Sequence, residues 1–266
     1  MERKLEEFVF VPRRNENAVE VPSKITGEFA VSVYKAYQEA KKEFQDNPYF
    51  KLELKNDELI HSTLQDSALI NQIIAQYGIR TLLPQDLRDM RIADMIKGKH
   101  YVNVVALILR GSNAKIYDER TKNIIVQLEE RVDVSRLDKE PALITNLKVV
   151  PSNDIKNGGY GFTFVPLIGD NFNVVYSDKF LLKYRGWKFN SFDENGLPEG
   201  LNQNGDGKFT NYTEDSRLSR AYLGDVANLY SGWSSLDGSS DGGRVVVVSD
   251  AAGGATKKLE KKILNL

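Results

Sequence analysis

The chain has 266 residues, of which 41% are hydrophobic and 27% charged, as in proteins that fold around a sizeable core. Its 36 basic and 37 acidic residues leave a net charge of −1, which provides neither a basic surface for nucleic acid nor a polybasic patch for membranes. The absence of cysteine excludes disulfides, thiol nucleophiles and cysteine-bound zinc.

The sequence predicts a soluble protein. It contains no apolar run of about 18 residues, and residues 1–7 are too highly charged for a signal peptide. We therefore expect no membrane insertion, and we leave the location open, including a virion or cell surface reached by assembly.

The N-terminal part predicts mainly helices, because apolar residues recur there at steps of three and four. The segment 8–12 is either a short strand or an ordered arm. Residues 49–54 alternate as a strand does. The expected helices cover residues 26–44, 66–77 (ending at Gly78) and 84–95.

After Gly98 the pattern changes to strands separated by Asn, Gly and Asp turns. One further helix is expected over residues 119–132, and residues 192–220 are rich in loops. The C-terminal residues 257–266 form either a docked helix or a frayed end. The expected strands are 101–109, 142–150, 160–166, 172–176, 180–187 and the valine run 245–248.

No catalytic motif is recognisable. His61 and His100 are the only histidines, and neither belongs to a triad spacing, a Gly-x-Ser-x-Gly elbow or a His-Glu-x-x-His motif. Residues 202–207 resemble the start of a calcium loop, but Thr213 stands where a bidentate Glu is needed, so a tight turn is the better interpretation. We expect no enzyme activity, no catalytic residues, no metal site and no cofactor.

Residues 222–242, which we call the Tyr/Ser/Gly segment, have an unusual composition. Fifteen of these 21 residues are Gly, Ser, Asp, Asn or Tyr. Antibody binding loops have a similar composition, because Tyr offers a rigid amphipathic face and small polar residues adapt their hydrogen bonds. The composition also fits a flexible linker.

Apolar residues within the segment argue against a linker. Leu223, Leu229, Trp233 and Leu236 recur at a spacing that is neither helical nor strand-like, which suits irregular backbone held on a core. The segment runs into four consecutive valines, typical of a fully buried strand. An ordered surface loop is therefore expected.

The end of the chain resembles a known family. The run Ser216-Arg217-Leu218-Ser219-Arg220-Ala221-Tyr222, the polar stretch after it and the closing Gly243-Arg244-Val245-Val246-Val247-Val248 are similar to the variable region of diversity-generating retroelement target proteins. Residues 187–198 resemble the lead-in to that region, especially in archaeal and candidate-phyla members. The resemblance is loose over 79–185 and does not reach 1–78.

The resemblance implies a C-type lectin fold of the formylglycine-generating-enzyme type, hence an α+β protein. It also implies diversification of adenine-containing codons, which turns Asn codons into codons for Asp, Ser, Tyr and Gly. Because the chain lacks cysteine, the oxidase activity of that enzyme is excluded, and the fold would serve another function. An archaeal or archaeal-virus protein is the expected type.

The implied organisation is an N-terminal helical or mixed region (1–78), a C-type lectin-like domain (79–250) with its variable region at about 217–248, and a tail (251–266). The implied function is binding of a macromolecule, either a protein or a surface glycan, with an oligomeric state that the sequence leaves open. Tyr222, Tyr230 and Trp233 would be aromatic anchors. The expected ligand-binding residues are Tyr222, Asp225, Asn228, Tyr230, Ser231, Trp233, Ser234, Ser235, Asp237, Ser239, Ser240 and Asp241.

Two other functions are compatible with the sequence. The first is a structural virion or assembly component in which the Tyr/Ser/Gly segment is a joint. The second is a carbohydrate-active or other hydrolase that uses paired acids within residues 193–215.

Overall fold

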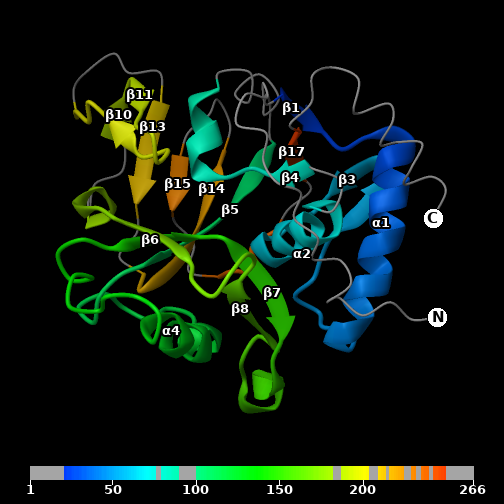
Figure 1. Cartoon of the computed structure of the whole chain (residues 1–266), viewed down its shortest axis with the longest axis horizontal. Helices are drawn as coiled ribbons and strands as arrows, with labels where there is room; N and C mark the ends of the chain where they lie inside the picture. Colours follow the sequence, from blue (N-terminus) through cyan, green and yellow to red (C-terminus); the bar gives the residue numbers. More distant parts are fainter. Residues whose placement is uncertain are drawn as a thin grey trace.

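The computed structural model describes residues 21–75, 79–89, 100–181, 187–203, 209–213, 216–224, 229–231, 235–239 and 242–249. These residues form the mixed α/β architecture of Figure 1, in which a large mixed sheet carries helices. The α+β class expected from the sequence is confirmed at this level. The predictions for residues 8–12 and 257–266 lie outside the described residues.

The large sheet is built around β5, and its main path runs in the order β10-β13-β15-β14-β5-β16-β3-β2. Strand β6 pairs with the end of β5 and with β9. The strands are β2 (Glu53–Lys55), β3 (Glu58–Ile60), β5 (Tyr101–Leu109), β6 (Ala142–Thr145), β9 (Asn173–Tyr176), β10 (Trp187–Phe189), β13 (Phe209–Thr213), β14 (Leu218–Leu223), β15 (Leu229–Ser231) and β16 (Gly243–Arg244).

Three smaller sheets surround the large one. Strand β17 (Val246–Ser249) is the middle strand of a three-stranded sheet, between β1 (Val21–Lys24) and β4 (Ile79–Thr81). Strands β7 (Leu147–Pro151) and β8 (Phe162–Pro166) form a hairpin at the bottom of Figure 1, and β11 (Ser191–Phe192) pairs with β12 (Pro198–Glu199).

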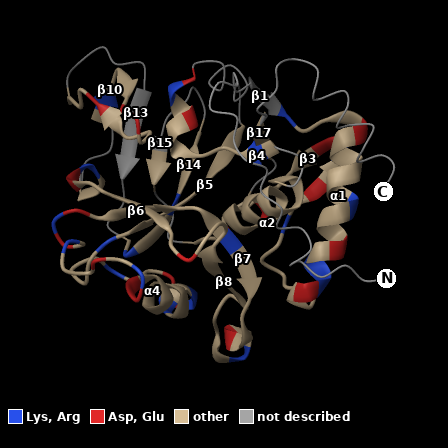
Figure 2. Cartoon of the chain, in the orientation of Figure 1, with Lys and Arg blue, Asp and Glu red and all other residues tan. Residues whose placement is uncertain are grey.

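Three α-helices are described: α1 (Gly27–Lys41), α2 (Leu64–Ala75) and α4 (Lys122–Glu129). Figure 2 shows charged residues along α1, whereas α2 has only Asp66 and is buried on all sides. Short 3₁₀ helices are η2 (Lys42–Phe44), η3 (Pro84–Arg88), η4 (Glu119–Thr121), η5 (Asn153–Asn157) and η6 (Asp178–Leu181).

Two hydrophobic clusters, one on each face of β5, explain the apolar runs of the sequence. Val105, Leu107 and Leu109 point into the first cluster, which contains α1 and α2. Val102, Val104, Ala106 and Ile108 point into the second. The valine run divides in the same way, with Val245 and Val247 in the first cluster and Val246 and Val248 in the second. A strand buried on both faces needs no polar residue, so the predicted burial of the valine run is confirmed.

Several predicted elements agree with the structure. Strand 101–109 is confirmed residue for residue, and the helix predicted for 26–44 consists of α1 followed by η2. The helix predicted from residue 66 begins at Leu64, because Thr63 and Asp66 form a capping box: the Asp66 amide donates to Thr63 Oγ1 (3.2 Å) and the Thr63 amide donates to Asp66 Oδ2 (2.9 Å).

Other predictions were wrong in part. The single strand 142–150 is two strands in different sheets, because Asn146 adopts a positive φ of 64° and its side chain bonds the backbone of Ile168 and Asn171. The strand predicted from residue 180 is instead the 3₁₀ helix η6 up to Leu181, where the Ser177 hydroxyl accepts from the Lys179 amide. Of the strand 49–54, only residues 53 and 54 belong to β2, since Asn47 Oδ1 turns the chain by accepting from the Tyr49 amide (2.9 Å).

The N-terminal region, expected at residues 1–78, shares its core with the rest of the chain. The first cluster runs from Ile25 to Val247, and β1 and β3 pair with β17 and β16. Within the described residues, the two sides of the expected boundary are therefore packed together.

Candidate functional site

The two ends of the Tyr/Ser/Gly segment are fixed on opposite sides of β5, at the same level. On one side, Leu223 at the end of β14 pairs with Val102. On the other side, Gly243 in β16 pairs with Tyr101, whose amide donates to Gly242 O (2.9 Å). Both ends of the segment therefore lie next to the first two residues of one buried strand.

Tyr222 and Tyr230 form an aromatic stack where the segment begins. Strand β15 turns back along β14, so that Tyr230 faces Tyr222 with ring centroids 5.0 Å apart and planes tilted by 14°. Tyr222 also meets Tyr101 edge-on at 5.9 Å. A Cβ at Gly224 would lie 2.4 Å from the Tyr230 ring, so this close approach depends on glycine. Tyr222 is buried, whereas Tyr230 is half-buried.

Arg220 supports this stack from within the sheet. Its Nη1 donates to Asn103 Oδ1 (2.7 Å), and its guanidinium lies over the rings of Tyr222 (4.8 Å) and Tyr101 (5.6 Å). Asn103 in turn donates to Ser62 O (2.9 Å), just before α2. The stack is therefore held by a buried cation that is itself held by the scaffold.

Residues 235–238, which we call the anchoring turn, hold the middle of the segment on the protein. The Leu236 side chain is fully buried in the first hydrophobic cluster, and its amide donates to the Tyr160 hydroxyl (3.1 Å). Asp237 is buried among polar groups. Its Oδ2 is 3.1 Å from Lys51 Nζ, and its Oδ1 accepts from Arg120 Nη2 (3.3 Å) and from the Ser235 hydroxyl.

The residues that bind the anchoring turn also contact one another through hydrogen bonds and cation–π contacts. Arg120 binds Asp118 through Nε (2.8 Å) and Nη2 (3.0 Å) and lies over the rings of Tyr160 (4.6 Å) and Tyr49 (5.0 Å). The Tyr160 hydroxyl donates to Asp118 and lies 3.2 Å from Asp237 Oδ1. This network therefore pairs two cations, Lys51 and Arg120, with two carboxylates.

The electrostatics of the network favour an ionised Asp237. Burial by itself would raise the pKa of Asp237, but hydrogen bonds from Ser235 and Lys51 and the charges of Arg120 and Lys51 outweigh it, so the pKa is lowered. Burial, followed by the hydrogen bond to Asp118, raises the pKa of Tyr160. The hydrogen bond to Asp118 likewise raises the pKa of Arg120.

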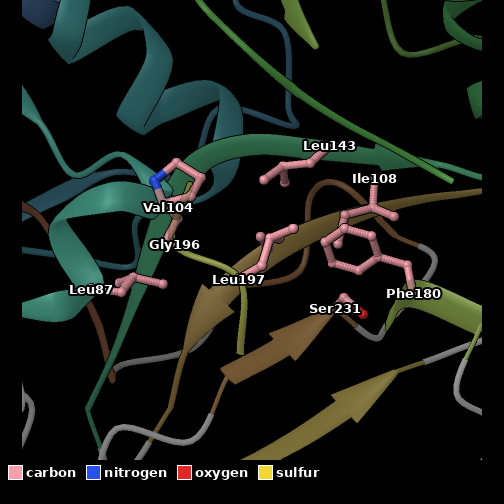
Figure 3. A pocket seen from close by; sticks show the side chains of 10 residues that line it. Leu87, Val104, Ile108, Leu143, Phe180, Gly196, Leu197 and Ser231 are labelled. Carbon is pink, nitrogen blue, oxygen red and sulfur yellow. The ribbon is translucent and has the colours of Figure 1, made fainter. Parts of the chain in front are cut away.

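Ser231 faces the opposite side of the sheet and is buried. Its hydroxyl accepts from Arg110 Nη2 (3.3 Å), and Arg110 also donates to Ser219 Oγ (2.9 Å), Ser216 O (2.8 Å) and Phe180 O (3.0 Å). Beside it lies a small pocket lined almost wholly by apolar side chains, among them Ile108, Leu143 and Phe180 (Figure 3). Ser231 thus belongs to the interior of the domain.

The structure describes half of the predicted ligand-binding residues. Tyr222, Ser231 and Asp237 are buried, with 8%, 1% and 8% of their surface exposed, which corrects the expectation that they lie open on a display surface. The reasons are the aromatic stack, the bond to Arg110 and the network around Asp237. Tyr230, Ser235 and Ser239 are partly exposed, and the Ser239 hydroxyl donates to His61 O. Asp225, Asn228, Trp233, Ser234, Ser240 and Asp241 lie outside the described residues.

The apolar anchors behave as predicted where they are described. Leu223 and Leu236 are buried, as are Val245 to Val248. For Leu229 only the backbone, in β15, is described. The segment is therefore tied to the core at its start, in its middle and at its end.

The sequence did not indicate which residues bind the anchoring turn. Lys51, Arg120 and Tyr160 lie 186, 117 and 77 residues away from Asp237. None of them belongs to a motif, so only the fold brings them together. A possible signal was the pair Asp118 and Arg120, two residues apart, but such pairs are common on solvated surfaces.

Asp193, one of the acids of the hydrolase alternative, has structural partners. Asp193 accepts from the amides of Asn195 and Leu197 (both 2.9 Å) and pairs with Lys179 (3.3 Å). Asp206 and Asp215 lie outside the described residues, as does most of the calcium-like loop 202–207. Arg244 lies between Glu58 (2.8 Å) and His100 (3.1 Å), so His100 takes part in a polar cluster on β16.

No protein-family model, curated protein or solved structure matches this chain. In the part of the chain that the structure describes, no helix has the length and apolar character needed to cross a bilayer.

Proposed function

We propose that this chain is a non-enzymatic binding protein whose C-terminal part, a C-type lectin-like domain, presents the Tyr/Ser/Gly segment to a macromolecular ligand. The observation that carries the proposal is the framework of the segment: its two ends flank the start of β5, and the anchoring turn holds its middle on the core. A linker-like composition in a segment whose described ends and middle are fixed on the core is typical of a recognition surface.

The resemblance to retroelement target proteins supplies the second argument. Arg220 lies in the strand that leads into the segment and Arg244 in the strand that closes it, within the two runs that carry the resemblance. Both strands pair with β5, so sequence changes at the exposed positions between them would leave this pairing intact. A retroelement could therefore diversify the exposed residues in between, while the buried ones, such as Ser231 and Leu236, stay constant.

Tyr230 has the strongest claim to a ligand contact among the described residues. Its ring is half-buried and is held against Tyr222, which rests on Arg220. An aromatic side chain that is already held in place loses little conformational entropy when a ligand binds, and aromatic residues dominate binding hot spots. Ser235 and Ser239 are partly exposed and would form hydrogen bonds with the ligand at the edge of the contact around Tyr230.

The proposed partner is a protein or a surface glycan, met at a virion or cell surface. The neighbouring DNA tests the retroelement part of this proposal. We expect a reverse-transcriptase gene and a near-copy of the repeat that encodes residues 217–248, differing mainly at adenines. If both are missing, the structural virion component becomes the better explanation.

A biochemical test separates binding from catalysis. Tyr230→Ala should weaken binding of ligands selected on the wild-type protein, while purified protein should leave sugars, esters and phosphoesters unchanged. Turnover of any of these substrates that is lost in Asp193→Ala would instead support the hydrolase.

A further inference from the structure

We infer that Asp237 is a positioning residue and not a ligand contact: it locks the anchoring turn to the scaffold and so fixes the middle of the Tyr/Ser/Gly segment. That this segment serves recognition rests on the proposed function. The locking itself does not, since it concerns only contacts within the chain.

All oxygen atoms of Asp237 already have partners. Oδ1 accepts from Ser235 and Arg120, Oδ2 is paired with Lys51, and the main-chain oxygen accepts from Lys51 Nζ (2.8 Å). A ligand that used this carboxylate would first have to break charge-assisted hydrogen bonds, which are about twice as strong as neutral ones. A contact with a ligand is therefore a poor use of this side chain.

The partners come from three separate parts of the chain. Lys51 precedes β2, Arg120 belongs to η4, and Tyr160 precedes β8. Because Lys51 Nζ binds both a carboxylate oxygen and the main-chain oxygen of Asp237, it fixes the backbone as well as the side chain. The turn is thus restrained from several directions.

Gly238 places the other side of the anchoring turn against Arg220. A Cβ at this position would lie 2.7 Å from Arg220 Nη2, the group that supports the aromatic stack. The Gly238 amide also closes the turn onto Ser235 O (3.4 Å). The anchoring turn therefore lies against Arg220, the residue that supports the stack of Tyr222 and Tyr230.

Charge balance makes position 237 specific for aspartate. Lys51 and Arg120 face Asp118 and Asp237, and the side chains of Asp118 and Asp237 are only 8% and 12% exposed. In Asp237→Asn the shape remains, but one oxygen is replaced by an NH2 group that would point its own hydrogens at Lys51 or Arg120. That cation would then lose its carboxylate partner, and Lys51 would keep only the main-chain oxygen of residue 237.

The test is amide hydrogen exchange of the full chain, monitored by NMR. Exchange rates are measured at Leu236 and Gly238 in the anchoring turn and, for comparison, in α2 and β5. Asp237→Asn and Lys51→Met should each speed exchange in the anchoring turn by about tenfold or more, with less than about threefold change in α2 and β5. Lys51→Arg keeps the cation and should stay within about threefold of the wild type. Lys179→Met is the matched control, because Lys179 forms a similar, partly exposed ion pair with Asp193.

Two results would overturn the inference. Exchange at Leu236 and Gly238 that is unchanged in Asp237→Asn would show that the carboxylate does not hold the turn. Exchange that rises equally in the turn, α2 and β5 would show that Asp237 only contributes to global stability. In the double variant Asp237→Asn/Lys51→Met, the exchange rate should rise by less than the product of the two single fold-increases, since both changes remove the same interaction. These exchange measurements need no ligand, so they test the inference even if the proposed ligand binding is wrong.

Discussion

Leu236→Ala tests whether the Tyr/Ser/Gly segment is anchored in the core. The side chain is 0% exposed and packs in the cluster that contains α1, α2 and the inner residues of β5. The change removes roughly three methylene equivalents at about 0.8 kcal/mol each, or about 2.4 kcal/mol of transfer free energy. The cavity left behind adds to this, so we expect unfolding to become easier by about 2–5 kcal/mol.

The assay is urea unfolding at 25 °C of the wild type, Leu236→Ala and a control, Val126→Ala. Val126 is on α4 and is 55% exposed, so its loss should change the free energy of unfolding by no more than about 0.5 kcal/mol. A midpoint shift with an unchanged slope would assign the difference to stability. A cost below about 1 kcal/mol for Leu236→Ala would refute the anchoring, because a linker residue has no core to leave.

Three further predictions follow from the same contacts. Because the pKa of Asp237 is lowered in the folded state, its contribution to holding the anchoring turn should be complete above the unfolded value of about 3.9 and should fade as the pH drops through the folded value. Exchange protection at Leu236 that is unchanged once NMR shows the Asp237 carboxyl to be protonated would contradict this. Gly238→Ala should cost about 1–2 kcal/mol in thermal unfolding, because its Cβ would press on the movable end of Arg220, and a neutral result would mean that the turn lies farther away. Tyr230→Ala should weaken ligand binding by about 2 kcal/mol with little loss of stability, whereas Tyr222→Ala should cost about 3 kcal/mol in stability; equal stability losses would show that both rings are core.

Regular elements with a clear period could be predicted from the sequence. Strand β5 is a nine-residue, mainly apolar run, and helix α1 has apolar residues at helical spacing. The valine run indicated burial on both faces. The prediction was less accurate where one side chain redirects the backbone. Asn146 ends a strand that its apolar neighbours would continue, and Ser177 starts a 3₁₀ helix in an apolar stretch. Such local hydrogen bonds compete with periodicity and leave little trace in it.

The candidate site, too, was only partly predictable from the sequence. Composition identified the Tyr/Ser/Gly segment and its apolar anchors, which the structure buries where they are described. Composition could not separate exposed polar residues from buried ones, because Ser231 and Asp237 are bound by Arg110, Lys51 and Arg120 from distant parts of the chain. Long-range pairing of this kind depends on topology.

The most direct test of the proposed display surface is a library on the surface of yeast. Positions 228, 230, 234 and 239–241 are randomised, residues 235–238 are kept, and the library is selected against one unrelated probe protein, lysozyme. We predict folded binders whose melting temperature stays within a few degrees of the wild type. We predict none from a control library with six randomised positions on the exposed face of α4 and its flanks, residues 119, 122, 123, 126, 130 and 131. If the segment library yields only unfolded variants, or if the α4 library yields binders equally often, the claim that this segment is a recognition surface is contradicted.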